Sequence, residues 1–112
     1  MEKTYTILAL AALILFASGC SQAKTYGVGI EGGGLLSSNR FSPDAVTVRM
    51  GDSVTWTNND DSPHTVTSDS GSEMQSNTIA PGQTYSHLFL QSGTYTYHCA
   101  IHPNMRGTVI VQ

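Results

Sequence analysis

The stretch YTYHCAIHPNM, residues 95–105, decides which fold and which chemistry the sequence supports. Side chains of a β-strand point alternately to its two faces. Tyr95, Tyr97 and Cys99 therefore share one face, while His98 points to the other. We expect Cys99 to enter the core at the end of a strand and His98 to face outward.

Three potential metal donors follow one another in this stretch, with the spacing Cys-x2-His-x2-Met. Cys99 ends the strand, and His102 and Met105 lie in the turn that follows. Pro103 stiffens this turn because its ring fixes φ. A further imidazole, His64, begins a different strand. If the two strands are neighbours, His64 reaches the same point from across the core.

Two imidazoles, one thiolate and one weakly bound thioether form the ligand set of a blue-copper electron-transfer site. Such a set serves both Cu(II) and Cu(I), so the site rearranges little during electron transfer. We therefore predict one copper ion per chain, held by His64, Cys99, His102 and Met105. Zinc is the alternative metal. A structural zinc site needs a strong fourth ligand, however, and a thioether is a weak one.

The remaining histidines and two further methionines have simpler interpretations. A single histidine on a strand is usually a surface residue, which is our prediction for His87 and His98. Met50 and Met74 are predicted to serve in packing or in loops. None of these four residues is assigned to the predicted copper site.

The rest of the chain is predicted to be all-β. Segments of alternating apolar and polar residues are separated by turns rich in Gly, Pro, Asn and Asp. The predicted strands are residues 26–30, 45–49, 53–57, 65–67, 83–90, 94–99 and 107–111. Val54 and Trp56 share one face of their strand, and residues 35–40 have no strand pattern. Seven to eight short strands predict a Greek-key β-sandwich or barrel.

The charge of the chain argues against nucleic-acid binding. The 112 residues include 5 Lys or Arg and 8 Asp or Glu, for a formal net charge of −3. Domains that bind nucleic acid carry a basic patch, and no run of basic residues is present here. The length is sufficient for one domain.

The first residues have the pattern of an export signal. Lys3 is followed by an apolar run, residues 7–17, that is too short to span a bilayer, and then by small residues and Cys20. The end of this segment resembles the lipobox of bacterial lipoproteins, which implies cleavage before Cys20 and lipid on its thiol. An ordinary signal peptide, which would leave Cys20 as a free thiol, is the alternative.

These features predict three segments. Residues 1–19 form a lipoprotein-type signal peptide, residues 20–25 a lipidated tether, and residues 26–112 the folded domain. We expect the mature protein to be exported and attached through Cys20 to a bacterial membrane, facing the periplasm or the exterior.

Cys99 requires a chemical explanation in an exported protein. The chain has 2 cysteines, and Cys20 cannot form a disulfide if it carries lipid. Cys99 is then a lone thiol in an oxidising compartment, where free thiols are a liability. A buried cysteine on its own is more often a packed apolar residue than a ligand, but its neighbours here favour metal ligation.

Several segments resemble the cupredoxins, the small blue copper proteins of the plastocyanin and amicyanin type. The resemblance lies in FSP at 41–43, VRMGDSVTWTN at 48–58, PHTV at 63–66, PGQ at 81–83 and GTYTYHC at 93–99. It covers roughly residues 41–111, and the ligand loop is similar to that of amicyanin. By this resemblance, His64, Cys99, His102 and Met105 match the copper ligands, and the implied function is electron transfer.

The same resemblance implies where electrons enter and leave. In the family, the histidine of the C-terminal ligand loop is exposed at its edge within an apolar patch. His102 would then be the electron port, surrounded by Ala100, Ile101, Pro103 and Met105. Redox proteins would dock there transiently, over a small interface, with the carrier as a monomer.

Residues close to His64 complete these expectations. Asp60, Asp61 and Asp69 are expected to steer a basic redox partner. Asn59 and Thr65 are candidates for hydrogen bonds that tune the ligands. The family often has Asn where Thr65 stands, and that Asn braces the two ligand loops. The tuning of the reduction potential is therefore left open by the sequence.

Two other functions remain as alternatives. A periplasmic copper chaperone or storage protein with the same fold is the main one, although such proteins favour exposed Met-rich or His-rich sites. A metal-free adhesion domain is the other. An enzyme is not expected, because multicopper oxidases and copper nitrite reductases need additional histidine clusters, and the chain has only 4 histidines.

Overall fold

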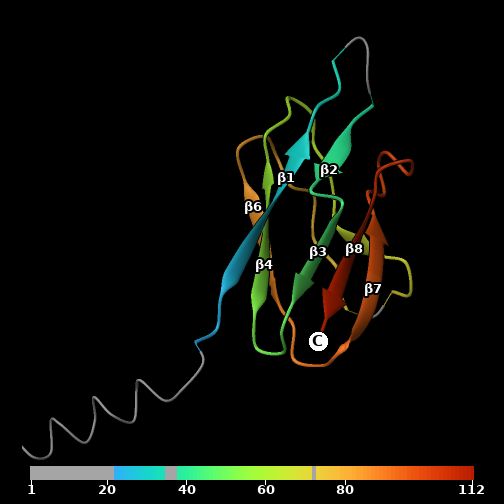
Figure 1. Ribbon diagram of the computed structural model, residues 1–112. Coiled ribbons are helices and arrows are strands. Elements are labelled where there is room, and N and C mark those ends of the chain that lie inside the picture. The colour runs from blue at the N-terminus through green and yellow to red at the C-terminus, as the bar shows by residue number, and fades with distance from the viewer. Residues whose placement is uncertain (1–21, 35–37, 72) are drawn as a thin grey trace, which may run out of the picture.

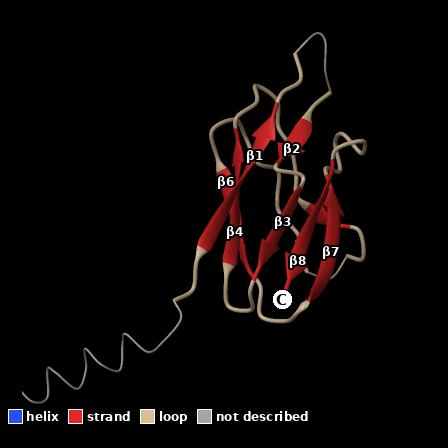
Figure 2. Cartoon of the chain, viewed as in Figure 1, coloured by secondary structure: helices blue, strands red, loops and turns tan. Residues whose placement is uncertain are grey.

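The computed structural model describes residues 22–34, 38–71 and 73–112. These residues form eight strands and no helix (Figures 1 and 2). The strands are β1 (Thr25–Glu31), β2 (Arg40–Ser42), β3 (Ala45–Val48), β4 (Ser53–Asn58), β5 (Thr67–Ser68), β6 (Thr84–Leu88), β7 (Gly93–His98) and β8 (Arg106–Val111). The predicted all-β fold is confirmed. The predicted signal peptide and Cys20 lie outside the described residues.

The strands form two four-stranded sheets that face each other. The first has the order β2-β1-β4-β6 and the second the order β3-β8-β7-β5. From β2 to β7 the chain changes sheet at every connection, so neither sheet can form without the other. The consecutive pairs β1–β2 and β7–β8 each stay within one sheet. The second pair is joined by residues 99–105 at one end of the sandwich (Figure 1).

The core lies between the sheets and is built by strand alternation. Val54 and Trp56 are both 0% exposed, as their shared parity predicted, and Tyr97 of β7 packs against Trp56 from the other sheet. The indole N–H of Trp56 donates to the Tyr97 hydroxyl over 3.0 Å. Gly107 is paired with Tyr97 across β7–β8, and a Cβ at this position would clash with the tyrosine ring. A large aromatic cluster therefore fills the core beneath the C-terminal ligand loop.

Three elements differ from the sequence-based prediction. Strand β6 ends at Leu88 rather than at Leu90. Strand β2 was not predicted, and it forms by pairing Arg40–Ser42 with the end of β1. Strand β5 begins at Thr67 rather than at Thr65. His64 instead exchanges two backbone hydrogen bonds with Ile79, of 3.2 and 2.7 Å. This isolated bridge fixes the backbone from which the His64 side chain enters the core.

The opposite end of the sandwich receives the start of β1. The Lys24 N–H donates to the Asp52 carboxylate over 2.9 Å, and the Ser53 N–H donates to the Lys24 carbonyl over 2.9 Å. The chain is thus held against the turn between β3 and β4 before β1 begins.

Within the described part of the chain, no helix has the length and apolar character needed to cross a bilayer.

Candidate metal centre

Three of the four predicted ligands meet at one end of the sandwich. His64 precedes β5, Cys99 directly follows β7, and His102 lies in the loop between β7 and β8. Their donor atoms all lie within 4.8 Å of one another. Cys99 Sγ is 3.6 Å from His64 Nδ1 and 3.9 Å from His102 Nδ1. His64 and Cys99 are fully buried, and His102 is half-buried.

Met105 closes the loop that carries two of these donors. The Cys99 N–H donates to the Met105 carbonyl over 3.1 Å, and the Met105 N–H donates to the His102 carbonyl over 2.9 Å. The Met105 side chain is buried, with 2% exposed. These bonds tie the Cys-x2-His-x2-Met segment into one compact turn, so the sequence spacing is converted into spatial proximity.

Thr65 joins the two segments that carry the donors. Its backbone N–H donates to Cys99 Sγ over 3.4 Å. Its hydroxyl accepts the N–H of Ala100 over 2.8 Å. Thr65 therefore braces the two ligand loops, and it also contacts the thiol directly.

Asp60 holds the His64 ring from the side that faces away from Cys99. The distance from His64 Nε2 to the Asp60 carboxylate is 2.7 Å. Since an ionised carboxylate only accepts hydrogen bonds, Nε2 of the neutral ring must carry the proton. Nδ1 is then left with its lone pair toward Cys99, which is the tautomer that a metal requires.

The same contact sets the protonation of the acid. The hydrogen bond with His64, and next the N–H of Asp61, hold the pKa of Asp60 below its ordinary value. Asp60 was predicted only as a steering charge, and its role beside a ligand was missed. An acid four residues before a ligand histidine was the available signal. In a loop without a regular period, this spacing did not predict contact.

Asn59 does not have its predicted role as a partner of the ligands. Its side-chain amide donates to Glu31 over 2.8 Å, and its backbone N–H donates to the Ile30 carbonyl over 2.9 Å. Both contacts secure the end of β1. Apart from one another, the ligand side chains have Asp60 and Thr65 as hydrogen-bond partners in the part of the chain that the structure describes.

The other two histidines bind carboxylates and not the donor group. His87 Nε2 lies 3.1 Å from Glu73, and His98 Nδ1 contacts Asp69. Both side chains are partly exposed, at 23% for His87 and 26% for His98. Within residues 22–34, 38–71 and 73–112, neither histidine belongs to the metal-donor group.

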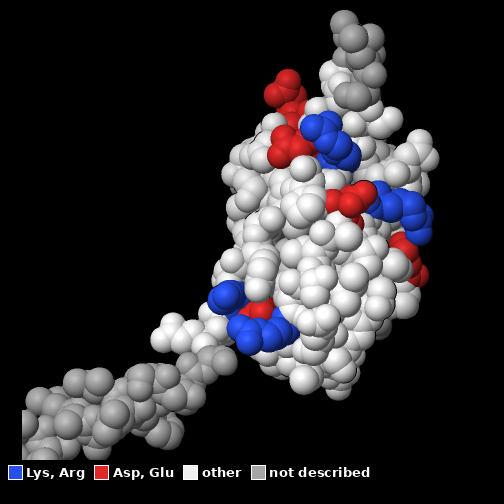
Figure 3. Space-filling model, in the orientation of Figure 1, with Lys and Arg blue, Asp and Glu red and all other residues white. Residues whose placement is uncertain are grey.

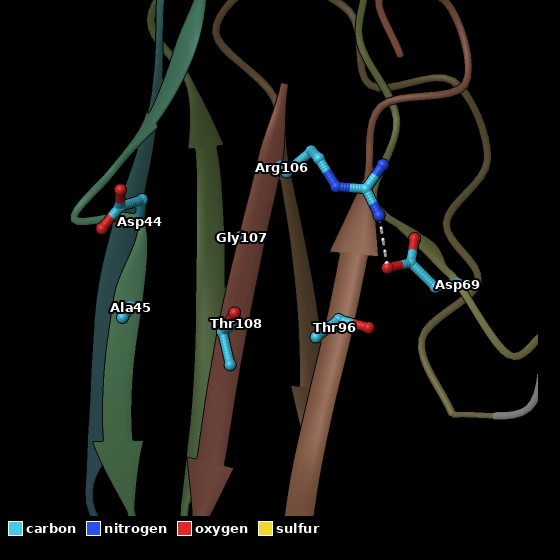
Figure 4. Close-up of a pocket in the computed structure, with 7 residues that line it drawn as sticks. All are labelled: Asp44, Ala45, Asp69, Thr96, Arg106, Gly107 and Thr108. Atoms are coloured by element: carbon cyan, nitrogen blue, oxygen red, sulfur yellow. Dashed lines mark hydrogen bonds and ion pairs between the residues drawn. The ribbon is translucent and has the colours of Figure 1, made fainter. Parts of the chain in front are cut away.

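Asp69 lies on the outer face of the second sheet, where it lines a shallow hollow of about 400 Å³ (Figure 4). Its carboxylate forms an ion pair of 2.9 Å with Arg106. The hydrogen bond from His98, and next that from Thr96, hold the pKa of Asp69 below its ordinary value. The hollow contains none of the predicted ligands. Because Asp69 is paired, it is less available for the steering that the sequence suggested.

The donor set fits one copper ion. First-row metals bind imidazole nitrogen and thiolate sulfur at about 2.0–2.3 Å, so donors at the corners of a triangle around the metal lie about 3.8 Å apart. The two sulfur–nitrogen separations, 3.6 and 3.9 Å, agree with this value, and the two imidazole donors lie within 4.8 Å of each other. Two imidazoles and a thiolate, with a buried thioether on the same loop, are the donor set that copper takes in electron-transfer sites.

Comparison with known proteins places this arrangement in a family. Residues 6–111 match the family described as the cupredoxin-like domain. Amicyanin from Paracoccus denitrificans is 35% identical over 81 residues, which cover 69% of this chain and 62%, or less than two thirds, of that relative. Plastocyanin from Scenedesmus fuscus is 36% identical over 100 residues, covering 79% of this chain and 98% of the relative.

Solved structures agree with the sequence comparison. A purple cupredoxin from Nitrosopumilus maritimus superposes with a TM-score of 0.70 at 30% identity, over 78% of this chain and 99% of that one. The oxidised state of an amicyanin variant superposes with a TM-score of 0.68 at 31% identity, over 79% of this chain and 82% of that one. A Cu(I) form of another amicyanin variant has a TM-score of 0.65 at 30% identity, over 86% of this chain and 89% of that one. By sequence and by fold, the chain belongs to the cupredoxin family.

Proposed function

We propose that this protein is an electron carrier that holds one copper ion and passes single electrons between redox proteins. The observation that carries the proposal is the group formed by His64, Cys99 and His102, whose donor atoms lie within 4.8 Å of one another. Copper bound there would supply the Cu(II)/Cu(I) couple. Similarity to amicyanin, which has been solved in oxidised and Cu(I) forms, supports this function.

The ligand residues are held by the backbone around them. His64 is paired with Ile79, Cys99 continues directly from β7, and Thr65 connects the two segments. Side chains locked by packing and by further hydrogen bonds keep their geometry when the charge of a site changes. A site that hardly rearranges suits rapid electron transfer better than it suits the release of copper.

Met105 is proposed as the fourth, weak ligand. It is buried at the base of the loop that carries Cys99 and His102. A thioether is a soft ligand that suits Cu(I) and makes a long axial bond in blue-copper sites. This side chain would favour copper over zinc at the position.

His102 is proposed as the electron port. It is the one half-buried member of the donor group, and the loop around it exposes Ala100, Ile101 and Pro103. Ile101 is 46% exposed. A small apolar contact of this kind gives the weak, transient docking that redox partners use. Asp61, which is exposed beside the site, remains the proposed steering charge for a basic partner.

We also propose that the protein is exported and anchored by lipid on Cys20. The support is the sequence pattern: a basic start, an apolar run at residues 7–17, and small residues before the cysteine. The anchor would hold the carrier at the membrane surface. Partners in the same compartment would then meet it by diffusion in the membrane plane.

Voltammetry of the copper-loaded full chain tests the carrier function. We expect a reversible one-electron wave that persists over many cycles in the presence of bathocuproine, a Cu(I) chelator. Loss of copper to the chelator at the first reduction, with no reversible wave, would contradict the carrier and favour a copper chaperone.

The port is tested by electron self-exchange between Cu(I) and Cu(II) copies, followed by NMR line broadening. Ile101→Asp places a charge beside His102 and should slow self-exchange, because two like-charged surfaces must then meet. Leu90→Asp makes the same kind of change at a residue that is 65% exposed at the opposite end, and it should have little effect. Equal rates in the two variants would contradict the port at His102.

A further inference from the structure

Most of the exposed large apolar side chains gather at the end of the molecule opposite the metal donors. In the described part of the chain they are Met50 at 57%, Leu88 at 49%, Leu90 at 65% and Ile101 at 46% exposed. Ile101 belongs to the metal loop. The other three flank the turns that follow β3 and β6, at the lower end in Figure 1.

Backbone hydrogen bonds bring these three side chains together. The Gly51 N–H donates to the Phe89 carbonyl over 2.7 Å, and the Phe89 N–H donates to the Asp52 carbonyl over 2.9 Å. Phe89 is buried. Leu88, the last residue of β6, and Leu90 are both exposed on either side of the buried Phe89, next to the turn that carries Met50. We call Met50, Leu88 and Leu90, together with Lys24 and Arg49, the basal surface.

The basal surface is positive. Lys24 and Arg49 are exposed, and their backbone N–H groups both donate to Asp52 over 2.9 Å. Asp52 is only 2% exposed, and its single negative charge offsets one of these two cations, which leaves the basal surface with a net positive charge. Figure 3 shows blue side chains, with a small red area beside them, at the lower end of the described chain.

The metal end has the opposite charge. Glu31, Asp60 and Asp61 lie close together there, since Glu31 accepts a hydrogen bond from Asn59, the residue before Asp60. Arg40 is paired opposite Glu31 across β1 and β2, and it reduces this charge without cancelling it. The molecule therefore has an apolar, positive end and a more acidic end that carries the metal donors.

We propose that the basal surface rests on an anionic lipid membrane and that the metal loop points away from it. This inference extends the proposed lipid anchor. The chain that leads back to Cys20 joins the domain at Lys24, directly at the basal surface. Apolar side chains enter the lipid interface, and Lys and Arg are attracted to anionic headgroups. The acidic metal end is repelled by the same headgroups, so His102 faces the aqueous compartment.

The surface is tested by tryptophan fluorescence on the full chain, purified from bacterial membranes. The protein is reconstituted in vesicles of phosphatidylglycerol and phosphatidylcholine, with copper kept as Cu(I). The single natural tryptophan, Trp56, is fully buried and gives a constant background. Leu90→Trp reports on the basal surface, and Ile101→Trp is the matched control at the metal end. The readout is the ratio of emission in brominated to unbrominated lipid.

We expect the Leu90→Trp emission to shift to shorter wavelength and to be quenched several times more strongly than that of Ile101→Trp. Replacing phosphatidylglycerol by phosphatidylcholine should reduce the quenching of Leu90→Trp. After oxidation of a separate sample to Cu(II), visible and EPR spectra like those of the wild type verify that both variants fold.

Three results would overturn the proposal, and they are distinguishable. Flotation of the protein with vesicles but equal quenching of the two variants would leave the anchor intact and exclude the basal surface as its contact. No flotation of the full chain would exclude both the anchor and this surface, while the voltammetry of the copper site would be unaffected. A Leu90→Trp shift that appears without vesicles and grows with protein concentration would assign the surface to a second copy of the chain.

Discussion

The backbone amide of Thr65 points at the sulfur of Cys99 over 3.4 Å, across 34 positions of sequence. The Thr65 hydroxyl accepts the N–H of Ala100, the residue after the cysteine. One residue thus fixes the relative position of the two segments that carry the metal donors. Hydrogen bonds to a ligand sulfur also tune the electronic properties of a copper–thiolate site.

Thr65→Val should weaken the link between the ligand segments. Valine keeps the branched shape but removes the acceptor for the Ala100 N–H, which should cost about 1 kcal/mol of unfolding free energy. Copper should also dissociate faster, because the two segments can separate more easily. Thr55→Val is the control, since it removes a hydroxyl that bonds Ser86 on an exposed face. Equal copper dissociation rates in Thr65→Val and the wild type would contradict the bracing role.

Asp60→Ala should weaken Cu(II) binding by about 10–100-fold, the usual effect of removing the partner of a ligand histidine. The carboxylate makes the imidazole a stronger donor to Cu(II), so the reduction potential should rise. Each tenfold loss confined to Cu(II) corresponds to about 59 mV. Asp60→Asn should have a smaller effect, because its amide oxygen can still accept from His64 Nε2.

Asp61→Asn is the matched control for this prediction. It removes a neighbouring exposed charge but leaves the contact with His64 in place. Competition titration with a chelator measures the Cu(II) affinity of each variant, and voltammetry measures its reduction potential. A potential that changes equally in Asp60→Asn, Asp60→Ala and Asp61→Asn would show that only charge matters and that the hydrogen bond does not.

Tyr97→Phe should destabilise the core without removing the copper site. Burial raises the pKa of Tyr97 to about 12, so its hydroxyl stays protonated and accepts from the Trp56 indole. Without this acceptor the buried indole N–H is unpaired, at a cost of about 1–3 kcal/mol. Tyr95→Phe removes a hydroxyl that donates to Gln91 at an exposed position, and it should cost less. Chemical denaturation measures the unfolding free energy of both variants. Equal losses of unfolding free energy would show that the buried Trp56–Tyr97 hydrogen bond contributes no more to stability than the exposed one.

Strand alternation explains why much of the fold could be predicted from the sequence. The placement of Val54, Trp56, Tyr97 and Cys99 depends only on a two-residue period and on turn residues nearby, which are local properties. Strand β2 could not be predicted in this way. Its three residues become a strand because the end of β1 pairs with them, and this pairing is a property of the folded chain.

The donor types and their spacing predicted the candidate site, but its supporting contacts were not predictable. His102 and Cys99 share a short loop, so their proximity follows from the spacing. The contact of Thr65 with Cys99 uses a backbone amide, which leaves no signature in the sequence. Asp60 was recognised as a charge near His64, yet only the folded loop turns its carboxylate onto the ring.

Stability should also depend on pH through Asp52, far from the metal donors. The N–H groups of Lys24 and then Arg49 hold the pKa of Asp52 below its ordinary value of 3.8. A carboxyl with a lowered folded-state pKa contributes stability above the unfolded pKa and loses it as pH falls through the folded pKa. Asp52→Asn should therefore lower the melting temperature at neutral pH, and the difference from the wild type should shrink below about pH 3.8.

Asp44→Asn, which changes an exposed acid in the turn before β3, is the control for Asp52. Its melting temperature should follow that of the wild type across the same pH range. A difference between Asp52→Asn and the wild type that grows toward acid pH would have the wrong sign for this account.

The visible absorption and EPR spectra of the copper-loaded chain, compared with those of Cys99→Ser, test the central claim most directly. The buried Cys99 sulfur lies between His64 Nδ1 and His102 Nδ1, so the wild type should show an intense thiolate-to-copper band. Cys99→Ser should lose that band, because serine offers no sulfur. A wild type without the band, or a band that survives in Cys99→Ser, would contradict a copper–thiolate centre at this position.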